Sequence, residues 1–163
     1  MMSGTVIRYL GWCAARVVRR EKPRVIAIAG SVGKTSTKEA IAVALGAHEP
    51  GSNVTVAPEN YNNELGVPLT ILGSMAPGKS ILKWVVLLVR ATALGFGLSS
   101  TTARTFVLEY ATDKPGDIAY LLSIARPNVA VLTVRQANPV ALVRFPHVLL
   151  TRKALARLEE MFK

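Results

Sequence analysis

The chain has 163 residues, of which half are apolar and 18% charged, which excludes a disordered chain and allows one domain with a packed core. Its net charge of +10 favours anionic partners such as nucleotides, nucleotide-linked substrates or phospholipid surfaces. Nucleic acid is disfavoured because the basic residues are scattered and are not interleaved with aromatic ones. The single cysteine, Cys13, cannot form an internal disulfide and favours a reducing, cytoplasmic location.

Residues 5–20 are predicted to form an amphipathic basic helix within an N-terminal segment, residues 1–22, that precedes the domain. The segment is too charged for the core of a signal peptide. Docking of the helix on the domain is favoured over binding to a membrane surface, which stays the alternative. The predicted apolar face consists of Val6, Leu10, Cys13 and Val17. The predicted basic face consists of Arg8, Arg16, Arg19 and Arg20.

A continuous apolar strand, residues 24–29, leads into the sequence Ala-Gly-Ser-Val-Gly-Lys-Thr-Ser and then into a predicted helix over residues 35–45. Small residues between a strand and a helix let backbone N–H groups surround phosphate oxygens at the positive end of the helix. Lys34 is placed to neutralise the outer phosphates of ATP, and the Thr35 hydroxyl to ligate its magnesium ion. The pattern is a shortened phosphate-binding loop, because Ile28 stands where the longer form has glycine. The residues predicted to bind the nucleotide here are Gly30, Ser31, Val32, Gly33, Lys34, Thr35 and Ser36.

The remaining elements alternate between strands and helices, which predicts an α/β fold of the phosphate-binding-loop type, with a mostly parallel sheet flanked by helices over residues 23–163. The predicted strands after the loop are residues 54–56, 105–109 and 129–134. Helices are predicted over residues 67–75, 80–94 and 149–162. A further helix is predicted to open at Asp113 to Asp117, with Pro115 in its first turn, and to run to Arg126.

Residues 81–98 form the most apolar stretch of the chain. Their ten Leu, Ile, Val and Phe residues favour membrane insertion by roughly 3 to 6 kcal/mol, whereas Lys83 and Arg90 oppose it by roughly 5 to 7 kcal/mol. Because the sum is near zero, the stretch is interpreted as a buried or partner-facing helix and not as a membrane span.

Glu109 ends one predicted strand, and ligands of parallel α/β sheets bind beyond the carboxyl ends of the strands. Its carboxylate is therefore predicted to ligate the magnesium ion together with Thr35, and a strand-end salt bridge is the alternative. The loop over residues 58–66 is rich in asparagine, which on chemistry alone is typical of a turn.

Three segments in the same order resemble the central domain of the Mur ligases. They begin at Ala29 (Ala-Gly-Ser-Val-Gly-Lys-Thr-Ser-Thr-Lys-Glu), at Asn60 (Asn-Tyr-Asn-Asn-Glu-Leu-Gly-Val-Pro-Leu-Thr) and at Leu108 (Leu-Glu-Tyr-Ala-Thr-Asp-Lys-Pro-Gly-Asp-Ile-Ala-Tyr-Leu). The chain is most similar to the members that join D-alanyl-D-alanine to a UDP-N-acetylmuramoyl tripeptide.

The resemblance implies an ATP-dependent ligase of peptidoglycan synthesis that acts through an acyl phosphate. It implies catalytic roles for Lys34 and Glu109, magnesium ligation by Thr35 and Glu109, and a UDP-linked muramyl peptide as a partner. It also implies that the asparagine loop lies near the nucleotide and the UDP substrate, through Asn60, Asn62 and Asn63.

The chain departs from the family pattern after its last predicted core strand. Ala141 and Val143 align with a histidine and a glutamate, and an apolar side chain cannot ligate magnesium. His147 is a weaker candidate to replace the histidine. Family members also have an N-terminal and a C-terminal domain, so the chain is expected to be truncated or to need other chains, with no ligase activity of its own.

Two alternatives therefore stay open beside the ligase. One is a nucleotide-binding or regulatory module without catalysis. The other is a membrane-associated interaction protein that uses residues 5–20 and 81–98.

Overall fold

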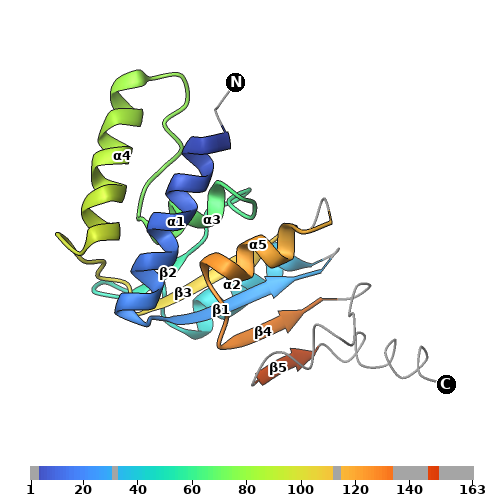
Figure 1. Ribbon diagram of the computed structural model, residues 1–163. Coiled ribbons are helices and arrows are strands. Elements are labelled where there is room, and N and C mark those ends of the chain that lie inside the picture. The colour runs from blue at the N-terminus through green and yellow to red at the C-terminus, as the bar shows by residue number, and fades with distance from the viewer. Residues whose placement is uncertain (1–3, 31–32, 112–114, 134–146, 151–163) are drawn as a thin grey trace.

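The computed structural model describes residues 4–30, 33–111, 115–133 and 147–150, and its centre is a five-stranded sheet with the strand order β2-β3-β1-β4-β5 (Figure 1). All neighbouring strands run parallel, which confirms the predicted α/β class. The strands are β1 (Arg24–Ala29), β2 (Val54–Val56), β3 (Thr105–Tyr110), β4 (Val129–Leu132) and β5 (His147–Leu150).

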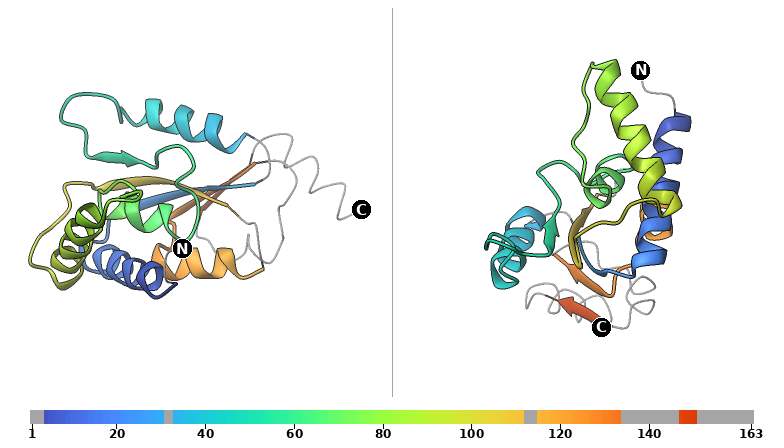
Figure 2. Two further views of the ribbon diagram at one scale, coloured as in Figure 1. Left: turned by 90° about the horizontal axis from the view of Figure 1, so that it is seen from above. Right: turned by 90° about the vertical axis from the view of Figure 1, so that its left-hand side faces the viewer.

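Helices cover both faces of the sheet, as a continuous apolar strand such as β1 requires. Figure 2 shows α2 on one face, and α1, α3 and α5 on the other, with α4 packed outside against α1. The helices are α1 (Gly4–Glu21), α2 (Lys34–Ala44), α3 (Gly66–Ile71), α4 (Ile81–Phe96) and α5 (Asp117–Ile124).

The two faces carry cores of different size. Alternate strand residues such as Ala27 and Leu108 join the larger core beneath α1 and α3, whereas Ile28 and Val107 join the smaller core beneath α2. Most of the described apolar burial therefore lies on the side of the sheet opposite α2.

Helix α1 docks on the domain, as the amphipathic pattern predicts. Leu10, Cys13 and Val17 are fully buried in the larger core. Arg16 and Arg20 donate hydrogen bonds to the carbonyl oxygens of Gly95 and Leu94, at the negative end of α4. Two arginines of the basic face of α1 thus hold the C-terminal end of α4 against α1.

Helix α4 is half-buried, in agreement with the interpretation of residues 81–98. Leu87, Ala91 and Leu94 are buried against the domain, and Ser80 caps the first turn by accepting a hydrogen bond from the N–H of Lys83. Within the described ranges, no helix has the length and apolar character needed to cross a membrane.

Several predicted boundaries are wrong, and α3, for example, ends at Ile71 and not at residue 75. Helix α5 begins at Asp117, so Pro115 precedes the helix, and Gly116 occupies the N-cap position with φ 97°. Leu149 and Leu150 belong to β5 and not to a helix, because they pair with Val131 and Leu132 of β4. The rest of the helix predicted over residues 149–162 lies outside the described residues.

Candidate functional site

The predicted phosphate-binding loop connects β1 to α2, as its sequence requires. Gly33 is the N-cap residue of α2 and has φ 83°, and Gly30 has φ 132°, both values that favour glycine. The chain therefore leaves β1 and enters α2 through two backbone conformations that suit glycine, next to the positive end of the helix. Ser31 and Val32, which are predicted to bind the nucleotide, lie outside the described residues.

Gly30 is needed for a close approach as well as for its backbone angle. A Cβ atom at Gly30 would lie 2.2 Å from Thr133 Oγ1 and 2.6 Å from the Thr133 carbonyl oxygen. Thr133 is itself held by a hydrogen bond of 2.9 Å from its N–H to the carbonyl oxygen of Ala29. The end of β4 thus supports the first turn of the loop.

Lys34 points back over the loop. Its Nζ atom donates a hydrogen bond of 2.6 Å to the carbonyl oxygen of Gly30, so the ammonium group lies where phosphate oxygens of a bound nucleotide are expected. Thr35 and Ser36 are exposed in the first turn of α2. Their hydroxyl groups are accessible to a ligand.

Glu109 lies at the same edge of the sheet as the loop. Its backbone pairs with Ile28, two residues before Gly30, in the register of β3 against β1. The residue is only 6% exposed, which is unusual for a carboxylate without partners. Two groups face it: Nδ2 of Asn62 donates a hydrogen bond of 3.2 Å to Oε1, and Nζ of Lys38 lies 4.0 Å from Oε2.

Lys38 was not predicted as a site residue, although it belongs to the candidate site. It lies four residues after Lys34, so both lysines share one face of α2, and Lys38 is 1% exposed. The salt-bridge alternative for Glu109 is therefore realised in the structure. The carboxylate still has two oxygens with further acceptor capacity, so the ion pair is compatible with metal ligation.

The asparagine loop reaches the site through one of its three predicted residues. The Asn62 side chain contacts Glu109. The backbone carbonyl oxygen of Asn62 accepts a hydrogen bond from the N–H of Ala111, just beyond β3. Asn63 instead closes the turn that leads into α3, because its Oδ1 accepts hydrogen bonds from the N–H groups of Leu65 and Gly66. Asn60 is exposed, with φ 65°.

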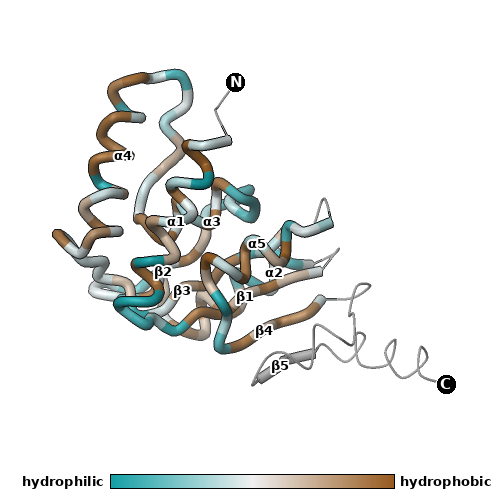
Figure 3. Tube along the Cα trace, in the orientation of Figure 1, coloured by the Kyte–Doolittle hydropathy of each residue, from teal (hydrophilic) through white to brown (hydrophobic). Residues whose placement is uncertain are grey.

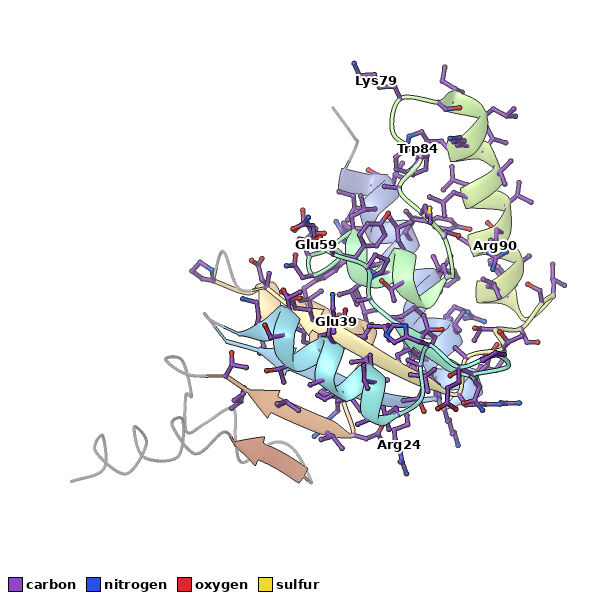
Figure 4. All side chains as sticks on the ribbon, turned by 180° about the vertical axis from the view of Figure 1, so that it is seen from behind. Arg24, Glu39, Glu59, Lys79, Trp84 and Arg90 are labelled. Atoms are coloured by element: carbon purple, nitrogen blue, oxygen red, sulfur yellow. The ribbon has the colours of Figure 1, made fainter. Side chains whose placement is uncertain are left out.

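Figure 4 shows this edge of the sheet from the side of α2: Glu39 marks α2 across the sheet, and Glu59 marks the asparagine loop. Arg24, at the start of β1, lies at the other end of the strand. The carboxyl ends of β1 and β3 lie opposite that end, and α2 follows β1 there.

These residues fit a magnesium nucleotide by their chemistry. Gly33 has open space where a Cβ atom would lie, so the loop leaves room for phosphate close to the backbone. Hydroxyl and carboxylate oxygens are the ligands that Mg²⁺ prefers, and the ion commonly takes only one or two of them from the protein. The described residues contain no group of three His, Cys, Asp or Glu side chains that could hold a metal ion.

Of the residues considered for a second metal site, the structure describes only His147. Ala141 and Val143 lie outside the described residues. The backbone of His147 pairs with Val129, which in turn pairs with Ile26 near the start of β1. His147 thus begins β5 at the amino end of the sheet, and the idea that it replaces the missing histidine is wrong.

Comparison with known proteins identifies relatives of the same kind. The family model described as the Mur ligase middle domain matches residues 28–82. UDP-N-acetylmuramoyl-tripeptide--D-alanyl-D-alanine ligase of Mycobacterium leprae is 36% identical over 66% of this chain. The enzyme of the same name from Buchnera aphidicola is 31% identical over 76% of it. The matched parts span 16% and 21% of those two relatives.

Solved structures agree with the sequence relatives. The structure of MurF ligase from Thermotoga maritima in complex with ADP has a TM-score of 0.55 and 30% identity, and covers 81% of this chain and 24% of that one. MurF from Acinetobacter baumannii has a TM-score of 0.52 and 27% identity, over 76% of this chain and 21% of that one. In sequence motifs, sheet topology and relatives alike, the chain belongs to the Mur ligase family and corresponds to its middle domain.

Proposed function

We propose that this chain forms the ATP-binding part of a ligase that joins D-alanyl-D-alanine to a UDP-N-acetylmuramoyl peptide. The names of its relatives support the reaction, and the ADP complex of the Thermotoga maritima structure supports the nucleotide. Residues 23–163 would be the nucleotide-binding domain and residues 1–22 a helix added before it. Since the chain spans about a fifth of the relatives' length, the binding of the two substrates would require further protein.

The observation that carries the proposal is the position of Glu109 beside the phosphate-binding loop. Its carboxylate is buried at the carboxyl end of β3, level with the last residues of β1. A parallel sheet places its ligand at this edge. A buried carboxylate next to a glycine turn and a helix N-terminus provides the charges that a magnesium nucleotide needs.

Each residue of the site then has a separate task. The backbone N–H groups from Gly30 to Thr35 would hold the phosphates, and Lys34 would exchange its hydrogen bond with the Gly30 carbonyl for phosphate oxygens. Thr35 and Glu109 would ligate the magnesium ion, with Asn62 and Lys38 holding the carboxylate in place. Phosphoryl transfer depends chiefly on positioning and on neutralising charge, so such a set of residues is appropriate for it.

A thermal-shift experiment tests nucleotide binding directly. Magnesium and ATP should together raise the melting temperature of the chain, and neither should do so fully alone. Lys34→Ala should abolish the rise, whereas the matched control Lys83→Ala, an exposed lysine on α4, should retain it. A wild-type chain that shows no shift at millimolar magnesium and ATP, or a Lys34→Ala variant that shifts as much as Lys83→Ala, would refute the proposed site.

A second candidate function is a nucleotide-binding module without ligase activity. The sequence favours it at one point, because Ala141 and Val143 cannot supply the second pair of metal ligands that the family resemblance implies. Release of phosphate from ATP tests the ligase. Release that requires both the UDP-linked tripeptide and D-alanyl-D-alanine supports the ligase, whereas a thermal shift with magnesium and ATP alone is expected of both candidates.

A further inference from the structure

Helix α4 presents an unusually apolar outer face. Leu82 is 73% exposed and Val86 is 59% exposed, and Figure 3 shows apolar residues along the length of the helix. The exposed residues recur at the spacing of one helical stripe, so they form a continuous surface. The exposed members of this stripe are Ile81, Leu82, Val85, Val86, Val89 and Phe96.

The structure fixes the direction of the stripe. The opposite side of α4 is buried through Leu87, Ala91 and Leu94. The Tyr9 hydroxyl forms a hydrogen bond of 2.7 Å with Thr92 Oγ1, which ties α4 to α1. The stripe therefore cannot turn inwards without breaking the contact between the two helices.

Positive charges lie near the two ends of the stripe, although Arg20 also pairs with Glu21 at 2.8 Å. Residues 65–108 contain Lys79, Lys83, Arg90 and Arg104 but no Asp or Glu. Figure 4 shows Lys79 beyond the start of α4 and Arg90 along the helix. At the other end of α4, a hollow next to Phe96 is lined by the side chains of Arg16, Arg19 and Arg20.

An aromatic pair borders the same end of the stripe. Trp12 of α1 is 41% exposed, and its ring centroid lies 5.6 Å from that of Phe96. The Arg16 guanidinium lies 4.9 Å from the centroid of the Trp12 ring. Tryptophan and arginine side by side at the edge of an apolar face are typical of proteins that contact the interfacial region of a bilayer.

We propose that α4 lies flat on the surface of a bilayer that contains anionic lipids. The stripe enters the boundary between headgroups and acyl chains, and the arginine hollow contacts lipid phosphates. With 16 residues α4 is about 24 Å long, shorter than the hydrocarbon core, so a helix on the surface fits better than a span. A second copy of the chain fits less well, because pairing two α4 helices would bring like charges together with no acidic residue in residues 65–108 to oppose them.

Co-sedimentation with vesicles tests the apolar stripe. The full chain should bind vesicles of phosphatidylcholine mixed with phosphatidylglycerol more strongly than vesicles of phosphatidylcholine alone. The double variant Leu82→Glu/Val86→Glu should lower the partition constant about tenfold or more, because both carboxylates would have to enter the interface. The control Val43→Glu changes a residue on α2 that is 68% exposed, and it should bind as the wild type does. Unchanged melting temperatures would show that all variants fold.

A further variant tests the arginine hollow. Among the described residues, the Arg19 side chain donates a hydrogen bond only to the carbonyl oxygen of Ala15, in its own helix. Arg19→Gln should therefore leave the fold intact. It should weaken binding to the mixed vesicles and reduce the dependence of binding on salt, with little effect on phosphatidylcholine alone. Equal binding of the wild type and Leu82→Glu/Val86→Glu, or no preference for the anionic vesicles, would overturn the proposal. So would a lipid-free dimer in sedimentation equilibrium that this double variant dissociates.

Discussion

The buried pair of Lys38 and Glu109 makes a strong prediction about stability. The two side chains are 2% and 7% exposed, and their charged atoms lie 4.0 Å apart. At an effective dielectric constant of about 20, two unit charges at that separation attract by about 4 kcal/mol. Removal of one charge leaves the other buried without compensation, which typically destabilises a protein by about 3 to 5 kcal/mol.

We expect Lys38→Met and Glu109→Gln each to lower the free energy of unfolding by about 3 to 5 kcal/mol. For a chain of this size, the melting temperature should fall by about 2 to 4 °C per kcal/mol. The double variant should lose less than the sum of the two by at least about 2 kcal/mol, since it leaves no unpaired charge. Urea unfolding of the four proteins measures the coupling. Additive losses would show that the two charges do not interact and would refute the description of the site.

The same variants connect stability with the proposed metal role. In Lys38→Met the carboxylate of Glu109 lacks its buried counter-charge, so a magnesium ion would supply the missing positive charge. Magnesium with ATP should therefore raise the melting temperature of Lys38→Met more than that of the wild type, and should not rescue Glu109→Gln. An equal rise in the wild type and Lys38→Met would show that the ion does not reach Glu109.

Three further predictions follow from single residues. Gly30→Ala should lower the free energy of unfolding by about 2 to 5 kcal/mol, because the new Cβ atom would overlap Thr133 and φ is 132°. Gly33→Ala has open space for its Cβ atom and should lower it by only about 1 to 2 kcal/mol. Urea unfolding measures both. Burial raises the pKa of Tyr110, whose hydroxyl donates to the Ala125 carbonyl, so the unfolded state releases the proton first and stability falls as the pH rises above about 10. Tyr110→Phe should lower stability by about 1 to 2 kcal/mol at neutral pH and reduce this alkaline loss, as seen in unfolding curves between pH 8 and 11. Burial also raises the pKa of the Cys13 thiol, so a thiol reagent at pH 8 should modify it slowly until denaturant is added.

The sequence was sufficient for the elements that depend on local patterns. The apolar run before Gly30 predicted β1, and the basic and apolar faces of residues 5–20 predicted a helix that docks. The phosphate-binding loop and Glu109 could be placed at one edge because carboxyl ends of parallel strands always meet there. Their proximity is therefore a consequence of topology.

Contacts between distant segments could not be predicted in this way. In the sequence, Lys38 looks like a solvent-exposed lysine of α2, because lysine is almost never buried without a partner. Its partner, Glu109, lies 71 residues further along the chain, so local patterns do not reveal the pair. Val148, Leu149 and Leu150 form an apolar run that fits a strand as well as a helix. Only pairing with β4 decides between them. The close approach of Gly30 to Thr133 likewise needs the order of the strands.

The arrangement of the two cores separates the proposed nucleotide site from the proposed membrane face. Lys38 contacts Glu109 on the α2 side of the sheet, whereas α4 packs on α1 on the opposite side (Figure 2). No described side chain of the α4 stripe belongs to the smaller core beneath α2. Mutations on the two surfaces should therefore act independently. The Leu82→Glu/Val86→Glu variant should show the full thermal shift with magnesium and ATP, and Lys34→Ala should bind anionic vesicles as the wild type does. If the double variant lost its nucleotide shift, the two surfaces would be coupled through α1, the helix that contacts α3, α4 and α5.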